Sequence, residues 1–136
     1  MTIVTQLVLI IEDHDPTRGL LEMYLRDAPF DCVFAASAKA GLEVYERARA
    51  AGRPVDLIVT DGAMPEMSGF QLATAIRESG DADTRIILLT AYDDPIAKPR
   101  AQLSGIRGIW FKPDGVVKIL ELITAALEAL RQSRGG

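Results

Sequence analysis

The stretch that decides the fold of this chain is Leu57-Ile58-Val59-Thr60-Asp61-Gly62. Its first four residues are aliphatic or β-branched, without an alternation of apolar and charged positions. Such a short continuous run is typical of a strand that is buried on both faces of a parallel sheet. Because the run leads directly into Asp61, we expect a carboxylate at the carboxyl end of a buried strand.

Four similar runs occur elsewhere, and helical patterns separate all five. The runs are residues 7–11, 32–35, 86–89 and 108–111. The first helical pattern begins at Asp15, and two more cover residues 38–50 and 70–78. The last helix has an apolar face that carries Ile119, Leu122, Ile123, Ala126, Leu127 and Leu130. Strands that alternate with helices predict a parallel sheet with right-handed crossovers. We therefore expect an α/β fold, a doubly wound five-stranded parallel sheet with helices on both faces.

Prolines suggest how two of the helices start. Asp15-Pro16 suits the N-cap and first residue of the first helix, whose buried stripe would be Leu20, Leu21, Tyr24 and Leu25. In the segment 93–105, Asp94-Pro95 also suits a helix start, but Pro99 lacks the N–H that a helix interior requires and disfavours the α conformation at Lys98. We expect the regular helix to start at Pro99, with residues 93–98 as a loop or single turn, and to end at Gly105.

Size and composition limit the possible classes of protein. The chain has 136 residues, 49 % of them hydrophobic, and a net charge of −4 without a basic stripe, so we expect one domain and no nucleic-acid partner. Cys32 is the one cysteine, which excludes an internal disulfide. We favour a buried, reduced thiol there over a redox sensor. With no membrane-length apolar run and no leader pattern, we expect a cytoplasmic protein with no membrane partner.

Chemically active side chains follow the strands at the positions where ligands bind in open parallel sheets. Glu12 and Asp13 follow the first run, Asp61 the third, Thr90 ends the fourth and Lys112 follows the fifth. Three crowded carboxylates repel one another unless a cation or proton joins them. An oxygen-rich set without His or Cys selects a hard ion, for which Mg²⁺ is the best candidate. A carboxylate can also act as a nucleophile towards phosphorus, with an ammonium and a hydroxyl to stabilise the developing charge.

Four segments together resemble the receiver domain of bacterial two-component response regulators. They are Leu9-Ile10-Ile11-Glu12-Asp13, residues 56–65, Leu88-Leu89-Thr90-Ala91 and Phe111-Lys112-Pro113. The resemblance covers roughly residues 6–131 and implies a flavodoxin-like (βα)5 fold. We accordingly expect a receiver domain over residues 1–131 and a flexible C-terminal tail over 132–136.

The resemblance also implies a role for each residue of the site. Asp61 would accept a phosphoryl group from a histidine kinase or a histidine phosphotransfer protein. Mg²⁺ would be held by Glu12, Asp13, Asp61 and the backbone carbonyl of Ala63. Thr90 would follow the phosphoryl group, with the backbone amide of Ala91 beside it, and Lys112 would pair with the phosphoryl oxygens. The Lys112–Pro113 bond would be cis.

One position departs from the family pattern. The residue three before Lys112 is usually aromatic in such domains and moves with the threonine, but here it is Ile109. Trp110 is displaced by one residue, which directs its side chain to the opposite face of the strand. We therefore expect Trp110 to be a packing residue. In place of the usual aromatic rotation, we expect activation to order or move residues 91–104. His14, next to the acidic pair, is interpreted as an exposed loop residue.

The resemblance leaves the output of the domain open. Our first choice is a stand-alone switch that changes its contacts with a downstream target protein. We expect it to be a monomer or weak homodimer. We do not expect an enzyme, apart from self-catalysed phosphotransfer and dephosphorylation. The alternative is a phosphorylation-independent interaction module, which Ile109 favours and the complete acidic set opposes. The hypothesis of a dedicated phosphatase is weaker, because such enzymes usually have a second acidic residue two positions after the nucleophile, and here that residue is Ala63. The chain could also be excised from a longer regulator.

Overall fold

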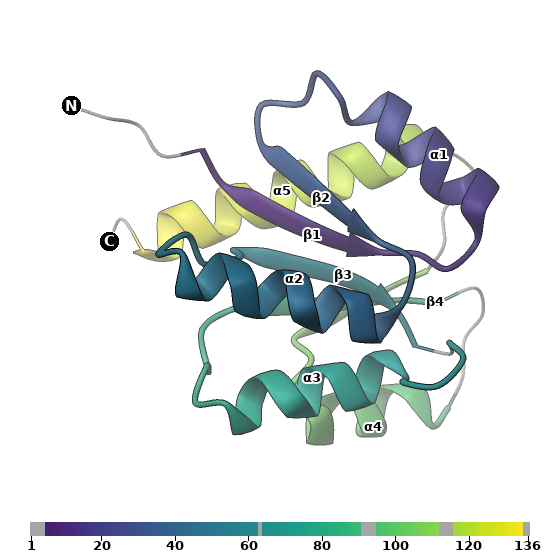
Figure 1. The fold of residues 1–136 in the computed structure, drawn as a ribbon, viewed down its shortest axis with the longest axis vertical. Coiled ribbons are helices and arrows are strands. Elements are labelled where there is room, and N and C mark those ends of the chain that lie inside the picture. Colours follow the sequence, from purple (N-terminus) through teal and green to yellow (C-terminus); the bar gives the residue numbers. More distant parts are fainter. Residues whose placement is uncertain (1–4, 63, 91–94, 112–115, 135–136) are drawn as a thin grey trace.

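The structure is a computed structural model that describes residues 5–62, 64–90, 95–111 and 116–134 (Figure 1). Strands and helices alternate strictly along the chain. In order they are β1 (Leu7–Ile11), α1 (Asp15–Tyr24), β2 (Asp31–Ala35), α2 (Ala38–Ala50), β3 (Leu57–Asp61), α3 (Gly69–Glu78), β4 (Arg85–Thr90), α4 (Ala97–Ser104), β5 (Gly108–Phe111) and α5 (Val116–Arg134). The five strands form one parallel sheet in the order β2-β1-β3-β4-β5. The expected doubly wound α/β fold is confirmed.

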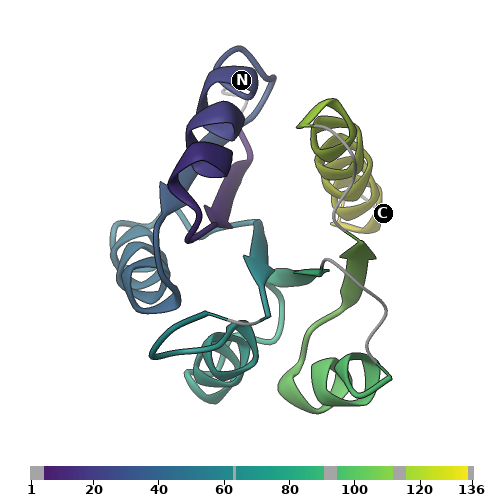
Figure 2. The ribbon, with the colours of Figure 1, turned by 90° about the vertical axis from the view of Figure 1, so that its right-hand side faces the viewer.

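Helices cover both faces of the sheet (Figures 1 and 2). Leu9, Ile11 and Ile58 pack on the face covered by α2, α3 and α4, whereas Val8 and Ile10 pack on the face covered by α1 and α5. Neighbouring residues of one strand thus enter different clusters, as the period of two requires. Because both clusters are apolar, the central strands have to be continuous apolar runs, which explains the sequence pattern.

The strand register brings the ends of the central strands to one edge. Ile11 pairs with Thr60 across β1 and β3, and Asp61 pairs with Leu89 across β3 and β4. The strand order reverses at this point, because the chain leaves β1 for β2 on one side and later returns to β3 on the other. Ligands of doubly wound folds bind at such a switch point.

Helix α1 differs in two respects from the expectation. His14 is its N-cap, and the side chain of His14 accepts a hydrogen bond from the backbone N–H of Thr17 at 3.3 Å. The expected N-cap, Asp15, is the first helical residue; Pro16 is tolerated next because the first N–H groups of a helix have no intrahelical acceptor. Of the expected stripe, Leu21 and Leu25 are buried, but Leu20 and Tyr24 are exposed. Leu21 and the C-cap residue Leu25, one turn apart, pack in the cluster under α1 and α5.

Helix α4 begins two residues earlier than expected. It runs from Ala97 to Ser104, so Pro99 is its third residue and the preceding Lys98 is helical. A proline in the first turn removes none of the helix's own hydrogen bonds, because those N–H groups have no acceptor one turn earlier within the helix. Gly105, with φ of 81°, ends the helix as expected.

Cys32 is half-buried in β2 against the cluster under α1 and α5. Burial, with a smaller contribution from the neighbouring Asp31 carboxylate, raises the pKa of the thiol to about 12. The raised pKa fits the expected reduced thiol, although the side chain is half-buried and not buried as expected. Among the helices of the described ranges, none combines the length and apolar character that crossing a membrane requires.

Candidate functional site

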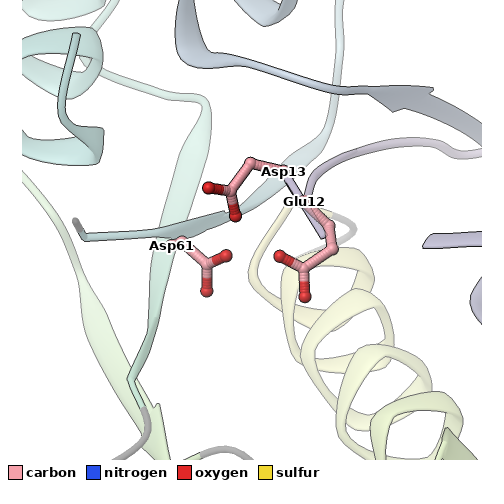
Figure 3. A group of neighbouring side chains, drawn as sticks. All are labelled: Glu12, Asp13 and Asp61. Carbon is pink, nitrogen blue, oxygen red and sulfur yellow. The ribbon is translucent and has the colours of Figure 1, made fainter. Parts of the chain in front are cut away.

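Three carboxylates converge at the switch point of the sheet (Figure 3). Glu12, Asp13 and Asp61 each offer one oxygen atom, and these atoms lie within 4.8 Å of one another. Glu12 and Asp61 are 4 % and 6 % exposed, while Asp13 lies on the surface. Like charges at this separation repel strongly when they are removed from water. The arrangement therefore favours a bound cation, and an exposed third ligand leaves that cation open to solvent.

The backbone of Glu12 is held from two sides. Its N–H donates to the carbonyl oxygen of Ala35 at 3.0 Å, which extends the β1–β2 pairing by one residue. Its carbonyl oxygen accepts from Nη1 of Arg18 at 2.9 Å, and Nη2 of Arg18 also pairs with Asp15. The first turn of α1 is thereby tied to the end of β1. This contact was missed by the sequence reasoning, since no local pattern signals a side chain that reaches back six residues.

The backbone of Asp61 is pressed against the start of α3. A Cβ atom added to Gly69 would lie 2.3 Å from the carbonyl oxygen of Asp61, and the N–H of Gly69 donates to the carbonyl of Gly62 at 3.1 Å. The hydroxyl of Thr60 donates to the same Asp61 carbonyl at 3.0 Å. Only glycine permits this approach, because any side chain at position 69 would displace the backbone that carries Asp61.

The start of α3 is itself rigidly defined. Ser68 accepts from the backbone N–H of Gln71 at 3.1 Å, and the side chain of Gln71 accepts from the N–H of Ser68 at 2.9 Å. This reciprocal capping box satisfies two otherwise unpaired helix donors. Since Gly69 follows the cap directly, the box fixes where α3 touches Asp61. Ser68 and Gln71 could have been found from sequence by the S-x-x-Q pattern.

Thr90 ends β4 at the same edge of the sheet. It is partly buried, pairs with Phe111 across β4 and β5, and lines a cavity of about 330 Å³ between α4 and β5. The structure thus brings Glu12, Asp13 and Asp61 together and places Thr90 at the same sheet edge. The remaining expected site residues, namely Lys112, the Ala63 carbonyl and the Ala91 amide, lie outside the described residues, as does the Lys112–Pro113 bond.

Ile109 and Trp110 lie on opposite faces of β5. Ile109 packs against the cluster under α2, α3 and α4 and lines the cavity beside Thr90, whereas Trp110 packs against the cluster under α1 and α5. The expectation that Trp110 is a packing residue is confirmed. Ile109 pairs with Leu88 across β4 and β5, whereas the residue that pairs with Thr90 is Phe111, which lines the same cavity.

Comparison with known proteins agrees with this geometry. The sequence model of the response regulator receiver domain matches residues 8–124, and the chain belongs to this family. It is 33 % identical over 117 residues to an uncharacterized 14.6 kDa protein of Leptolyngbya boryana, with 85 % of this chain and 86 % of that protein covered. It is 30 % identical over 120 residues to the heme response regulator HssR of Staphylococcus saprophyticus, covering 88 % of this chain. The chain spans 50 % of the length of HssR.

Solved structures of the same fold are similar. The chemotaxis protein CheY4 of Vibrio cholerae superposes with a TM-score of 0.77 at 28 % identity, covering 90 % of this chain and 98 % of CheY4. The receiver domain of Ssk1, solved in complex with the histidine phosphotransfer protein Ypd1 of Saccharomyces cerevisiae, superposes with a TM-score of 0.74 at 24 % identity, covering 91 % of this chain and 90 % of that one. The protein is thus a CheY-like response-regulator receiver domain, a signalling family and not a classical enzyme family. The alternative hypothesis, a phosphorylation-independent interaction module, is not favoured.

Proposed function

We propose that Asp61 is the phosphoacceptor of this receiver domain. One observation carries the assignment: Asp61 is the carboxylate that ends the central strand β3, beside Glu12 and Asp13 at the switch point. Its carboxylate oxygen would attack phosphorus, and the bond from phosphorus to the donor's nitrogen or oxygen would break. The donor leaves with its bonding electrons, and Asp61 becomes an acyl phosphate.

Mg²⁺ fits the donor set at this site. All three donors are carboxylate oxygens within 4.8 Å of one another, which suits a hard ion. Glu12, Asp13, Asp61 and the carbonyl of Ala63 would hold it, and when bound it would neutralise charge on the phosphoryl oxygens. Burial of Glu12 and Asp61 supports a strong electrostatic requirement for a cation, since their charges are poorly screened by water.

The other polar groups at the strand ends would orient the transferred group. Thr90 would donate its hydroxyl to a phosphoryl oxygen, the Ala91 amide would donate beside it, and the Lys112 ammonium would pair with another oxygen. Thr90 is supported by its position at the end of β4, next to the strand that carries Asp61. The roles of Ala91 and Lys112 rest on their places in the sequence.

The donor would be a histidine kinase or a histidine phosphotransfer protein, and the modified domain would change its contacts with a downstream target protein. A receiver domain of this fold, that of Ssk1, is found in a complex with such a phosphotransfer protein. Catalysis would be limited to self-catalysed phosphotransfer and dephosphorylation. We further propose a cytoplasmic monomer or weak homodimer with no nucleic-acid or membrane partner. The receiver domain would cover residues 1–131, and of the following residues 132–136, the first three continue helix α5.

The decisive experiment is intact-mass spectrometry after incubation with acetyl phosphate and Mg²⁺. The wild type should gain one phosphoryl group, and Asp61→Asn should gain none. Asp15→Asn is a matched control, because Asp15 is an exposed carboxylate near the same edge but outside the cluster. Full labelling of Asp61→Asn would refute the assignment.

A further inference from the structure

Helix α4 is seated on the protein by small side chains. Its buried residues are Ala97, Ala101 and Ser104, whereas Leu103 is 90 % exposed. A cavity of about 330 Å³ lies between α4 and β5, so this side of the helix is not filled by packing. Burying an alanine methyl contributes far less than burying a leucine or isoleucine side chain. The position of α4 must therefore depend on other contacts, and those that the structure shows are made with α3.

Two arginines join α4 to α3, which lie side by side (Figures 1 and 2). Arg77 of α3 donates from Nε and Nη2 to the carbonyl oxygen of Gly105, the residue that ends α4, at 3.1 and 2.8 Å. Arg100 of α4 places its guanidinium carbon 4.3 Å from the ring centroid of Phe70 in α3. This distance is typical of a cation–π interaction. The first contact lies at the end of α4 and the second at its middle.

Phe70 also lies close to Gly62, the residue that follows Asp61. A Cβ atom added to Gly62 would lie 3.1 Å from Cδ1 of Leu88 and 3.2 and 3.5 Å from Cε2 and Cζ of Phe70, so the edge of the ring occupies the space beside Gly62. Gly62 follows Asp61 directly, and its carbonyl accepts from the N–H of Gly69, the residue before Phe70. A single ring therefore lies beside Gly62 with its edge and under the Arg100 guanidinium with its face.

We propose that Phe70 and Arg100 are positioning residues for the phosphorylation of Asp61 and that they couple Asp61 to α4. The inference rests on the proposed function. Phe70 is 9 % exposed and packed, so a shift of the Gly62 backbone displaces the ring, and the guanidinium above the ring moves with it. Coupling of this kind is reciprocal, so a change in how α4 is held also changes the energetics of phosphorylation at Asp61.

The first test measures the rate of phosphorylation by acetyl phosphate at saturating Mg²⁺. Arg100→Leu and Phe70→Leu should each slow it about two- to fivefold, the factor expected from the loss of an exposed cation–π contact. Arg100→Lys keeps a cation and should restore most of the rate. Lys98→Leu removes a charge from the face of α4 that lines the cavity towards β5, and it should leave the rate unchanged. The double variant should be no slower than either single variant, because both remove the same contact.

The second test compares hydrogen exchange of residues 97–105 before and after phosphorylation, at equal modified fractions. The wild type and Lys98→Leu should show a phosphorylation-dependent change in exchange, which Arg100→Leu loses by at least half. Arg100 is exposed, so this variant should fold normally even if Phe70→Leu is destabilised. Wild-type rates and a wild-type exchange response in Arg100→Leu would overturn the coupling and leave Asp61 as the acceptor. Absence of any label on wild-type Asp61 would overturn both proposals.

Discussion

The hydroxyl of Tyr45 in α2 donates a 2.5 Å hydrogen bond to the carboxylate of Asp81, in the loop between α3 and β4. The same carboxylate accepts from the hydroxyl of Thr84 and from the backbone N–H groups of Asp83 and Thr84. Burial by itself raises the pKa of Asp81, but the hydrogen bonds from Thr84 and Tyr45 outweigh it and hold that pKa well below its usual value. Asp81 thus ties α2 to the loop at the edge of the sheet opposite Asp61.

Asp81→Asn should lower the free energy of unfolding at pH 7 by about 1–3 kcal/mol, because the hydrogen bonds to an ionised acceptor are weakened. Folding lowers the pKa of Asp81, so its carboxylate stabilises the protein above the pKa of the unfolded chain, about 4. That stabilisation is lost as the pH falls from there towards the folded-state pKa. Urea unfolding between pH 7 and 3 should therefore show the two proteins converging below about pH 4.

Asp83→Asn is the matched control for this experiment. Asp83 is exposed in the same loop, and its contact with Asp81 is made by its backbone N–H. Its substitution should change the unfolding free energy by less than about 0.5 kcal/mol. A difference between wild type and Asp81→Asn that stays constant from pH 7 to pH 3 would contradict the role given to the ionised carboxylate.

Asp13→Ala should weaken Mg²⁺ binding by at least about tenfold, since it removes a direct carboxylate from the cluster. Asp13 is exposed, so the loss should arise at the site and not from unfolding. Titration calorimetry with MgCl₂ measures the affinity. Glu22→Ala, which removes an exposed carboxylate of α1, should bind Mg²⁺ as the wild type does. Equal affinities for Asp13→Ala and the wild type would show that Asp13 is not a ligand.

Gly69→Ala and Gly19→Ala should have opposite effects on stability. The new Cβ at position 69 would lie 2.3 Å from the Asp61 carbonyl oxygen, so the backbone must shift, at a cost of about 1–3 kcal/mol. At position 19, within α1, nothing lies within 4 Å of the new Cβ, and alanine should stabilise the helix by about 0.5–1 kcal/mol. Thermal unfolding measures both changes.

The rate of phosphorylation by acetyl phosphate separates the local effect of Gly69 from general instability. Gly69→Ala should be phosphorylated more slowly than the wild type at temperatures where both are fully folded, because the backbone of Asp61 is displaced. Gly19→Ala should react at the wild-type rate. Unchanged stability and rate in Gly69→Ala would mean that α3 does not press on Asp61 in solution.

Cys32 should react slowly with iodoacetamide in the native protein. A thiol whose pKa is raised to about 12 is ionised to about one part in ten thousand at pH 8, and the thiolate is the reactive form. The same cysteine in urea-unfolded protein should react at least about a hundredfold faster. Rapid labelling of the native protein would instead favour the redox-sensing role.

Much of the fold could be predicted from the sequence, because its strands are continuous apolar runs. Such runs have few other places to lie than the centre of a parallel sheet, and the polar residues that follow them must then meet at one edge. This reasoning predicted the convergence of Asp61 with Glu12 and Asp13. The burial difference among the three is a result of packing, which leaves Asp13 on the surface and encloses the other two.

Tertiary structure decided the features that depend on distant neighbours. Leu20 and Leu21 have similar side chains, but only Leu21 faces the sheet, because the docking of α1 selects one narrow stripe. Pro99 is tolerated within α4 because it lies in the first turn of the helix, where a proline costs no intrahelical hydrogen bond. The sequence did not show where the helix begins, so it did not show that Pro99 lies in the first turn. The apolar runs of the sequence thus determined the order of strands and helices and the sheet edge at which the carboxylates gather. They could do so because each run is buried as a strand whatever its distant neighbours are. The contact of Arg100 with Phe70 and the approach of Gly69 to Asp61 arise only when the helices dock, because each joins residues whose separation the local sequence does not encode.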